Sequence, residues 1–156
     1  MPTRVVVAED EAIIRMDLRE LLQEEGYEVV AECGRGDEAV ELVREHAPDV
    51  ALLDIKMPGL DGISAAREIA SERLTAVVLV TAFSQRELIE EASDAGVQGY
   101  VVKPFTSGDL VPAIEMAVSR FTELATLESE VADLQDRLAT RKAVDRRSDI
   151  WAFGTV

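Results

Sequence analysis

The sequence predicts an α/β fold in which helices cover both faces of a parallel sheet. Segments rich in β-branched and aliphatic residues recur through the first two thirds of the chain, at Arg4–Ala8, Glu28–Glu32, Val50–Leu53, Val77–Thr81 and Gly99–Val102. Stretches with apolar residues at helical spacing separate these segments. Because strands and helices of these lengths alternate, we expect right-handed crossovers between parallel strands.

The first, third and fourth predicted strands contain VVVA, VALL and VVLV, which are apolar on both faces. Such strands are typical of a sheet that is covered on each side. The first connecting helix is predicted from apolar residues at Ile13, Met16, Leu18, Leu21 and Leu22. Gly26 follows them, and glycine is favoured where a helix ends.

The last predicted helix is much longer than the others, from Ser107 to about Arg147. Its only proline, Pro112, lies near the start, where proline is tolerated. Apolar residues recur every three or four positions at Ile114, Ala117, Phe121, Leu124, Leu127, Val131, Leu134 and Leu138. We expect the helix to pack on the sheet up to about residue 120 and then to form a coiled coil with a second copy; folding back on its own domain is the alternative.

The chain is acidic, with 31 acidic and 16 basic residues and a net charge of −15. Its surface should therefore repel nucleic acids and anionic membranes except at a local basic patch. The sequence has no secretory signal pattern, a single cysteine, and no apolar stretch near the roughly 20 residues that span a bilayer. These features predict a soluble, cytoplasmic protein.

Polar residues stand where the predicted strands end: Glu9 and Asp10 after the first, Asp54 after the third, Thr81 at the end of the fourth and Lys103 after the fifth. The carboxyl ends of parallel strands meet at one edge of a sheet, where ligands bind. Three carboxylates there repel one another unless a cation joins them, and oxygen ligands favour Mg²⁺. The sequence therefore predicts a magnesium site.

This set of residues predicts phosphoryl transfer. The Asp54 carboxylate can attack phosphorus to give an aspartyl phosphate, and Lys103 and Thr81 can contact phosphate oxygens. Taken singly, each residue has an ordinary explanation as a solvated acid, a turn hydroxyl or a loop lysine. Their order and spacing along one sheet favour the functional interpretation.

The segments AEDE (8–11), LLDIKMPGLDG (52–62), VTA (80–82) and GYVVKPF (99–105) resemble the receiver domain of two-component response regulators, over residues 4 to about 120. The resemblance implies a flavodoxin-like, CheY-like sheet of five strands in the order 2-1-3-4-5. It implies phosphorylation of Asp54 by a sensor histidine kinase. It also implies Mg²⁺ bound by Glu9, Asp10, Asp54 and the backbone carbonyl of Lys56, although the family more often has Asp at position 9.

The same resemblance implies a switch in which the Thr81 hydroxyl turns toward the phosphoryl group and Tyr100 rotates inward. Tyr100 as an ordinary core residue is the alternative. The Lys103–Pro104 bond resembles the family's cis peptide, a form found in only about 5–6% of X–Pro bonds.

The segment LESEVADLQDRLATRKAVDRR resembles the coiled-coil linker and first residues of the antiterminator-type RNA-binding module, ANTAR. The resemblance implies a homodimer that binds RNA hairpins and regulates transcription antitermination. The basic run consists of Arg137, Arg141, Lys142, Arg146 and Arg147, and suits contacts with RNA phosphates. Since only SDIWAFGTV follows, we expect a truncated module, so the predicted parts are a receiver (1–120), a linker with the start of the module (121–147) and a flexible tail (148–156).

Other functions compete with this interpretation. A stand-alone receiver would act by docking on proteins or as a phosphate sink, without binding RNA. A haloacid-dehalogenase-like phosphatase would carry Asp-x-Asp after its first strand, whereas Asp54 follows the third and position 56 is Lys. A flavodoxin is disfavoured because the acidic EDE would repel a flavin phosphate. We expect no enzymatic activity beyond Mg²⁺-dependent self-phosphorylation and dephosphorylation.

Overall fold

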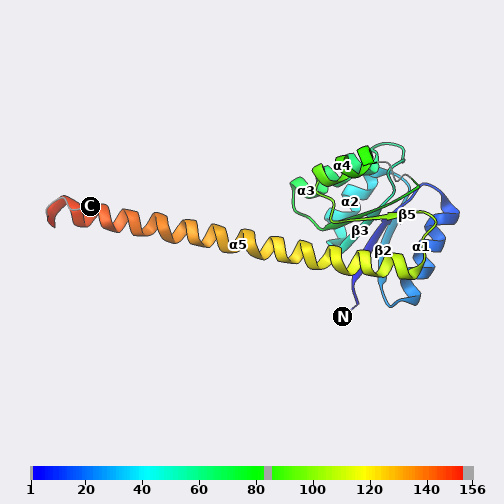
Figure 1. Ribbon diagram of the computed structural model, residues 1–156, viewed down its shortest axis with the longest axis horizontal. Helices are drawn as coiled ribbons and strands as arrows, with labels where there is room; N and C mark the ends of the chain where they lie inside the picture. Colours follow the sequence, from blue (N-terminus) through cyan, green and yellow to red (C-terminus); the bar gives the residue numbers. More distant parts are fainter. Residues whose placement is uncertain (1, 83–85, 153–156) are drawn as a thin grey trace. The chain divides into compact units, whose positions relative to one another are not determined.

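The computed structural model describes residues 2–82 and 86–152, and at 86–88 and 139–152 it describes the backbone alone (Figure 1). Five strands alternate with five helices in the described residues. The elements are β1 (Arg4–Ala8), α1 (Ala12–Glu24), β2 (Glu28–Cys33), α2 (Gly36–His46), β3 (Val50–Leu53), α3 (Gly62–Ser71), β4 (Ala76–Thr81), α4 (Arg86–Asp94), β5 (Gly99–Val102) and α5 (Ser107–Ala152).

The sheet has the order β2-β1-β3-β4-β5, and every neighbouring pair is parallel. This confirms the predicted order. In the register, Ala8 lies beside Leu53 and Thr81 beside Val102, so the strands end at one edge. The polar residues that follow them are therefore brought together, as expected for parallel strands.

Helices cover both faces of the sheet, with α1 and the start of α5 on one face and α2, α3 and α4 on the other (Figure 1). Alternate residues of β1 divide between the two cores. Val5 and Val7 pack with Leu18 of α1 and Ile114 of α5. Val6 packs with residues of α2, α3 and α4. The strands that read as apolar on both faces are thus buried on both faces.

Local signals fix the ends of several helices. Gly26, predicted as a helix stop, has φ +90 just after α1. The Asp61 side chain accepts a hydrogen bond from the Ser64 amide at 2.7 Å and so caps α3. The α2 helix ends at His46, and the next residue, Ala47, has left-handed backbone angles.

The chain divides into two compact units, Met1–Phe121 and Thr122–Val156, and α5 belongs to both. In the second unit, the described apolar side chains are about half exposed: Leu124, Leu127, Val131, Leu134 and Leu138. Among the described helices, none combines the length and apolarity needed to cross a membrane.

The end of α5 differs from the sequence prediction. The helix continues to Ala152, whereas it was predicted to end near Arg147; the flexibility of the tail 148–156 stays a prediction. Residues 148–152 (SDIWA) contain neither proline nor glycine, so no residue there interrupts helical hydrogen bonding. Residues 153–156 lie outside the described part of the chain.

Candidate functional site

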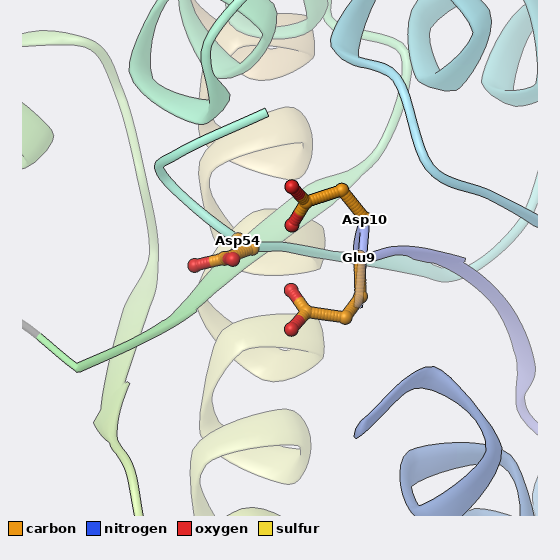
Figure 2. A group of neighbouring side chains, drawn as sticks. All are labelled: Glu9, Asp10 and Asp54. Carbon is orange, nitrogen blue, oxygen red and sulfur yellow. The ribbon is translucent and has the colours of Figure 1, made fainter. Parts of the chain in front are cut away.

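Three acidic side chains gather at the carboxyl edge of the sheet. Glu9 and Asp10 follow β1 and Asp54 follows β3, and in Figure 2 their carboxyl groups converge on one region. One carboxylate oxygen from each lies within 4.8 Å of the others. Glu9 and Asp54 are buried, whereas Asp10 is exposed. The cluster is therefore open to solvent on the Asp10 side.

Glu9 is the most deeply buried of the three, at 1% exposure. Its Oε1 accepts a hydrogen bond from Lys103 Nζ at 2.8 Å. Its Oε2 is buried and has no hydrogen-bond partner among the described residues. Burial raises the pKa of Glu9 to about 8, and the Asp54 carboxyl adds to the increase while Lys103 opposes it. A buried carboxylate oxygen without a donor is chemically suited to bind a cation.

Asp54 lies between a backbone donor and a cation. Its Oδ1 accepts a hydrogen bond from the Ile55 amide at 2.8 Å, and its Oδ2 lies 3.5 Å from Lys103 Nζ. The Asp54 amide donates to the Ala8 carbonyl at 3.0 Å, which fixes the backbone beside β1. The carboxylate is thus held with a positive charge on one side.

Lys103 links both buried carboxylates through its ammonium group. Burial lowers the pKa of Lys103, but the hydrogen bond to Glu9 and the charges of Asp54 and Glu9 outweigh it, so the pKa is raised. The charged form of Lys103 is therefore favoured in the site. The Lys103 amide donates to the Thr81 carbonyl at 2.7 Å, and the Lys103–Pro104 peptide is cis, which confirms that prediction.

The two predicted switch residues lie on β4 and β5. Thr81 is fully buried at the end of β4. Tyr100 is half-buried, pairs in register with Leu79 and packs against the core on the α2–α4 face. Burial raises the pKa of its phenol.

The loop after β3 needs two glycines to reach its position. A Cβ on Gly62 would lie 1.9 Å from the Asp54 carbonyl oxygen, and Gly59 has φ +80. Lys56 lies in this loop and, with Asp10 and Met57, lines a surface hollow of about 480 Å³. Because α3 begins directly against the backbone of Asp54, the loop returns close to the acidic cluster.

The predicted RNA-contact residues lie on α5, apart from this cluster in sequence. Arg137 is exposed and pairs with Asp133 at 2.8 Å. The side chains of Arg141, Lys142, Arg146 and Arg147 lie outside the described residues.

The ligand chemistry of the acidic cluster fits Mg²⁺. It offers carboxylate oxygens with neither histidine nor cysteine among them, and it includes the unpartnered Glu9 Oε2. Hard cations prefer such oxygen ligands, and Mg²⁺ usually keeps several waters. The exposed Asp10 side leaves room for them.

The comparison with known families shows which family the chain belongs to. Residues 5–115 match the response regulator receiver domain family. The chain belongs to this family. The sequence is also similar to known receivers over most of its length. It is 61% identical over 146 residues to the Transcriptional regulatory protein PdtaR of Mycobacterium tuberculosis, covering 94% of this chain and 71% of that protein. It is 35% identical to the chemotaxis protein CheY of Bacillus subtilis, covering 76% of this chain and all of that protein.

Solved receiver structures have the same fold. The receiver domain of NarL from Mycobacterium tuberculosis superposes with a TM-score of 0.71 at 35% identity, over 76% of this chain and 97% of that one. The response regulator domain of CheB from Thermotoga maritima gives 0.71 at 30% identity, over 76% of this chain and 98% of that one. The protein is therefore a receiver of a two-component response regulator.

One contact at the receiver site was not predicted from sequence. Arg15 on α1 donates from Nη1 to the Glu9 carbonyl at 2.6 Å. The only sequence signal was its place one to two helical turns after Asp10, a spacing common to many surface arginines.

Proposed function

We propose that this receiver accepts a phosphoryl group on Asp54 from the phosphohistidine of a sensor histidine kinase. The observation that carries the proposal is the Asp54 carboxylate held 3.5 Å from the Lys103 ammonium beside Glu9 and Asp10. An Asp54 oxygen attacks phosphorus, the phosphorus–nitrogen bond of the donor breaks, and its electron pair leaves with the imidazole. The product is an aspartyl phosphate.

Mg²⁺ is the proposed cofactor, and when bound it would neutralise charge on the transferring phosphoryl group. Glu9, Asp10, Asp54 and the Lys56 backbone carbonyl would hold it. Lys103 pairs with a phosphate oxygen once the phosphoryl group is in place, since its pKa keeps it charged. The receiver has no proposed activity beyond self-phosphorylation and dephosphorylation.

The proposed switch uses Thr81 and Tyr100. The Thr81 hydroxyl donates a hydrogen bond to the new phosphate, and its movement makes space for Tyr100 to rotate inward. The half-buried position of Tyr100 at the edge of a packed core supports this part, because a ring there can move between two packed arrangements.

The proposed output is transcriptional regulation by RNA binding in the manner of antiterminators, through a homodimer joined by α5, in the cytoplasm. Two observations support it: the similarity to a protein named as a transcriptional regulator, and the half-exposed apolar stripe Leu124–Leu138 next to the basic run. Arg137, Arg141, Lys142, Arg146 and Arg147 are the proposed phosphate contacts.

A second candidate is a receiver that acts by docking on another protein or as a phosphate sink. A groove of about 220 Å³ beside α4 and β5 favours it, and Ile89, Val97, Tyr100 and Arg120 contribute to its lining. Because Tyr100 lies in this groove, its rotation would change the surface that a partner meets.

The phosphoacceptor proposal is tested with radiolabelled acetyl phosphate and Mg²⁺. We expect label on the wild type and on Asp61→Asn, but none on Asp54→Asn. Asp61 is a matched control because it lies in the same loop and Asn can also cap α3. Unchanged labelling of Asp54→Asn would overturn the site.

The output is tested by light scattering and RNA gel shift with and without Mg²⁺ and beryllofluoride. A dimer that shifts hairpin RNA only with beryllofluoride supports antitermination. Beryllofluoride bound without retention of RNA favours the protein-docking candidate.

A further inference from the structure

Arg15 makes a partly buried contact with the backbone that carries the proposed metal ligands. Its Nη1 donates to the Glu9 carbonyl at 2.6 Å. Its Nε lies 3.8 Å from Glu32 Oε1 at the end of β2, and its side chain is 24% exposed. The guanidinium group therefore joins the loop after β1 to the end of the neighbouring strand.

Gly34 makes room for this contact. A Cβ at Gly34 would lie 3.1 Å from Arg15 Nη1, 3.3 Å from Asp10 Cα and 3.6 Å from the Glu9 carbonyl oxygen. The arginine head is thus enclosed between the loops that follow β1 and β2. Its planar group has donors pointing in fixed directions, which suits a contact made to two partners at once.

We propose that Arg15 is a positioning residue for Mg²⁺ binding, an inference that rests on the proposed metal site. The Glu9 carbonyl belongs to the same planar peptide unit as the Asp10 amide and Cα. Holding this oxygen therefore sets the direction in which the exposed Asp10 side chain leaves the backbone. Arg15 acts through the peptide and contacts neither carboxylate of the Glu9–Asp10 pair in any described hydrogen bond.

The proposal predicts a change in Mg²⁺ affinity opposite in direction to the change that charge alone would cause. Arg15 is a cation near a cation site, so its removal would strengthen Mg²⁺ binding if charge alone mattered. If the residue positions Asp10, its removal weakens Mg²⁺ binding. The Asp10 side chain then has more conformational freedom in the metal-free protein, and ordering it around the ion costs free energy.

Arg19 provides a matched control. It lies one turn further along α1 and pairs with the same Glu32 carboxylate at 3.3 Å, but it makes no hydrogen bond to Glu9 among the described contacts. Arg15→Ala and Arg19→Ala remove the same charge from the same helix. Alanine also favours the helix in both variants.

The test is Mg²⁺ titration by calorimetry on the full chain. We expect Arg15→Ala to bind about tenfold more weakly or worse, and Arg19→Ala to bind as tightly as the wild type or slightly tighter. Equal or tighter binding by Arg15→Ala overturns the proposal.

Thermal unfolding with and without Mg²⁺ separates positioning from plain stabilisation. A structural role would lower both midpoints and leave the Mg²⁺-induced increase unchanged, which counts against the proposal. Positioning reduces that increase in Arg15→Ala alone. If the wild type itself binds no Mg²⁺, the proposed metal site is wrong and this inference falls with it. If the wild type and Arg15→Ala bind Mg²⁺ equally well, the metal site stands and only the role of Arg15 is overturned.

Discussion

At the scale of single residues, Lys103 balances two carboxylates that would otherwise repel each other. It is the only described cation with its charged group within 4 Å of both Glu9 and Asp54. Without it, Glu9 would keep one buried oxygen unpartnered and lose the donor on the other. Lys103 and the proposed Mg²⁺ would therefore both offset the negative charge of the cluster.

Replacing Lys103 with Met should lower stability in Mg²⁺-free buffer by about 1–3 kcal/mol, since a buried acceptor loses its partner. Mg²⁺ should then raise the unfolding midpoint of Lys103→Met more than that of the wild type, because the ion supplies the missing positive charge. Thermal unfolding with and without Mg²⁺ measures both effects. An equal Mg²⁺ response in the two proteins would contradict the expectation.

Mg²⁺ binding should strengthen as pH rises toward about 8. The pKa of Glu9 is raised to about 8, so below this pH its neutral form is favoured in the metal-free protein. The cation requires the ionised form, and binding must therefore release a proton. We expect affinity to increase by up to about tenfold per pH unit below that value and to level off above it.

Calorimetry between about pH 6 and pH 8 measures this dependence. Glu9→Gln has no proton to release at this position. We expect it to bind Mg²⁺ more weakly, and its affinity should depend less on pH than that of the wild type. A wild-type affinity independent of pH would show that Glu9 is already ionised.

At the scale of secondary-structure elements, specific contacts fix the positions of helices relative to the sheet, and substitutions at these contacts should destabilise the fold. The close approach of α3 to the backbone of Asp54 is one such contact, at Gly62. The hydrogen bond from the Tyr27 hydroxyl to Glu115 Oε1, at 2.6 Å, is another and joins the residue before β2 to α5.

Gly62→Ala should destabilise the receiver by about 1–3 kcal/mol and weaken Mg²⁺ binding, because its Cβ would displace the Asp54 carbonyl. Gly108→Ala is the control: its Cβ would lie 3.5 Å from Thr106 Oγ1, an ordinary contact, and alanine favours the helix. Denaturant unfolding and Mg²⁺ titration measure the pair. Equal behaviour of the two variants would argue against the close contact.

Tyr27→Phe should cost about 0.5–1.5 kcal/mol through loss of the hydrogen bond to Glu115. Burial and this carboxylate both raise the pKa of the Tyr27 phenol, so the hydroxyl remains a donor at neutral pH. Glu115→Gln keeps an acceptor and should cost less. A double-mutant cycle by urea unfolding checks whether the two residues are coupled.

The sequence predicted the strands well because VVVA, VALL and VVLV are apolar on both faces. Short segments of this kind are typical of strands in a sheet that is covered on both sides. The acidic cluster was also predictable, since parallel strands end at one edge. The Tyr27–Glu115 bond was not, because the two residues are 88 positions apart and neither has a distinctive neighbourhood. The contact of Arg15 with the Glu9 carbonyl could not be predicted either, because every residue has a backbone carbonyl and the acceptor therefore leaves no signal in the sequence.

At the scale of the whole molecule, the apolar stripe of α5 stands out on a chain with net charge −15. Its described members recur at alternating spacings of three and four, the heptad pattern of a coiled coil. Charge alone would keep copies apart, so we expect association through α5 to rest on this stripe and to weaken as its apolar surface is lost.

Leu127→Glu should therefore convert a dimer into a monomer at micromolar concentration, as measured by light scattering. Ser129→Glu adds the same charge off the stripe and should leave the mass unchanged. A monomeric wild type, or equal masses for both variants, would contradict assembly through α5.

The central place of β1 has a consequence for synthesis. This strand is synthesised before the other four, yet it lies between β2 and β3, and its valines Val5 and Val7 share a core with Leu110 and Ile114 of α5. Its apolar faces cannot be fully covered until more than 100 further residues have been made. At typical rates of elongation the nascent chain exposes this strand for several seconds or longer. The strand that is made first among the five is thus among the last to be fully covered.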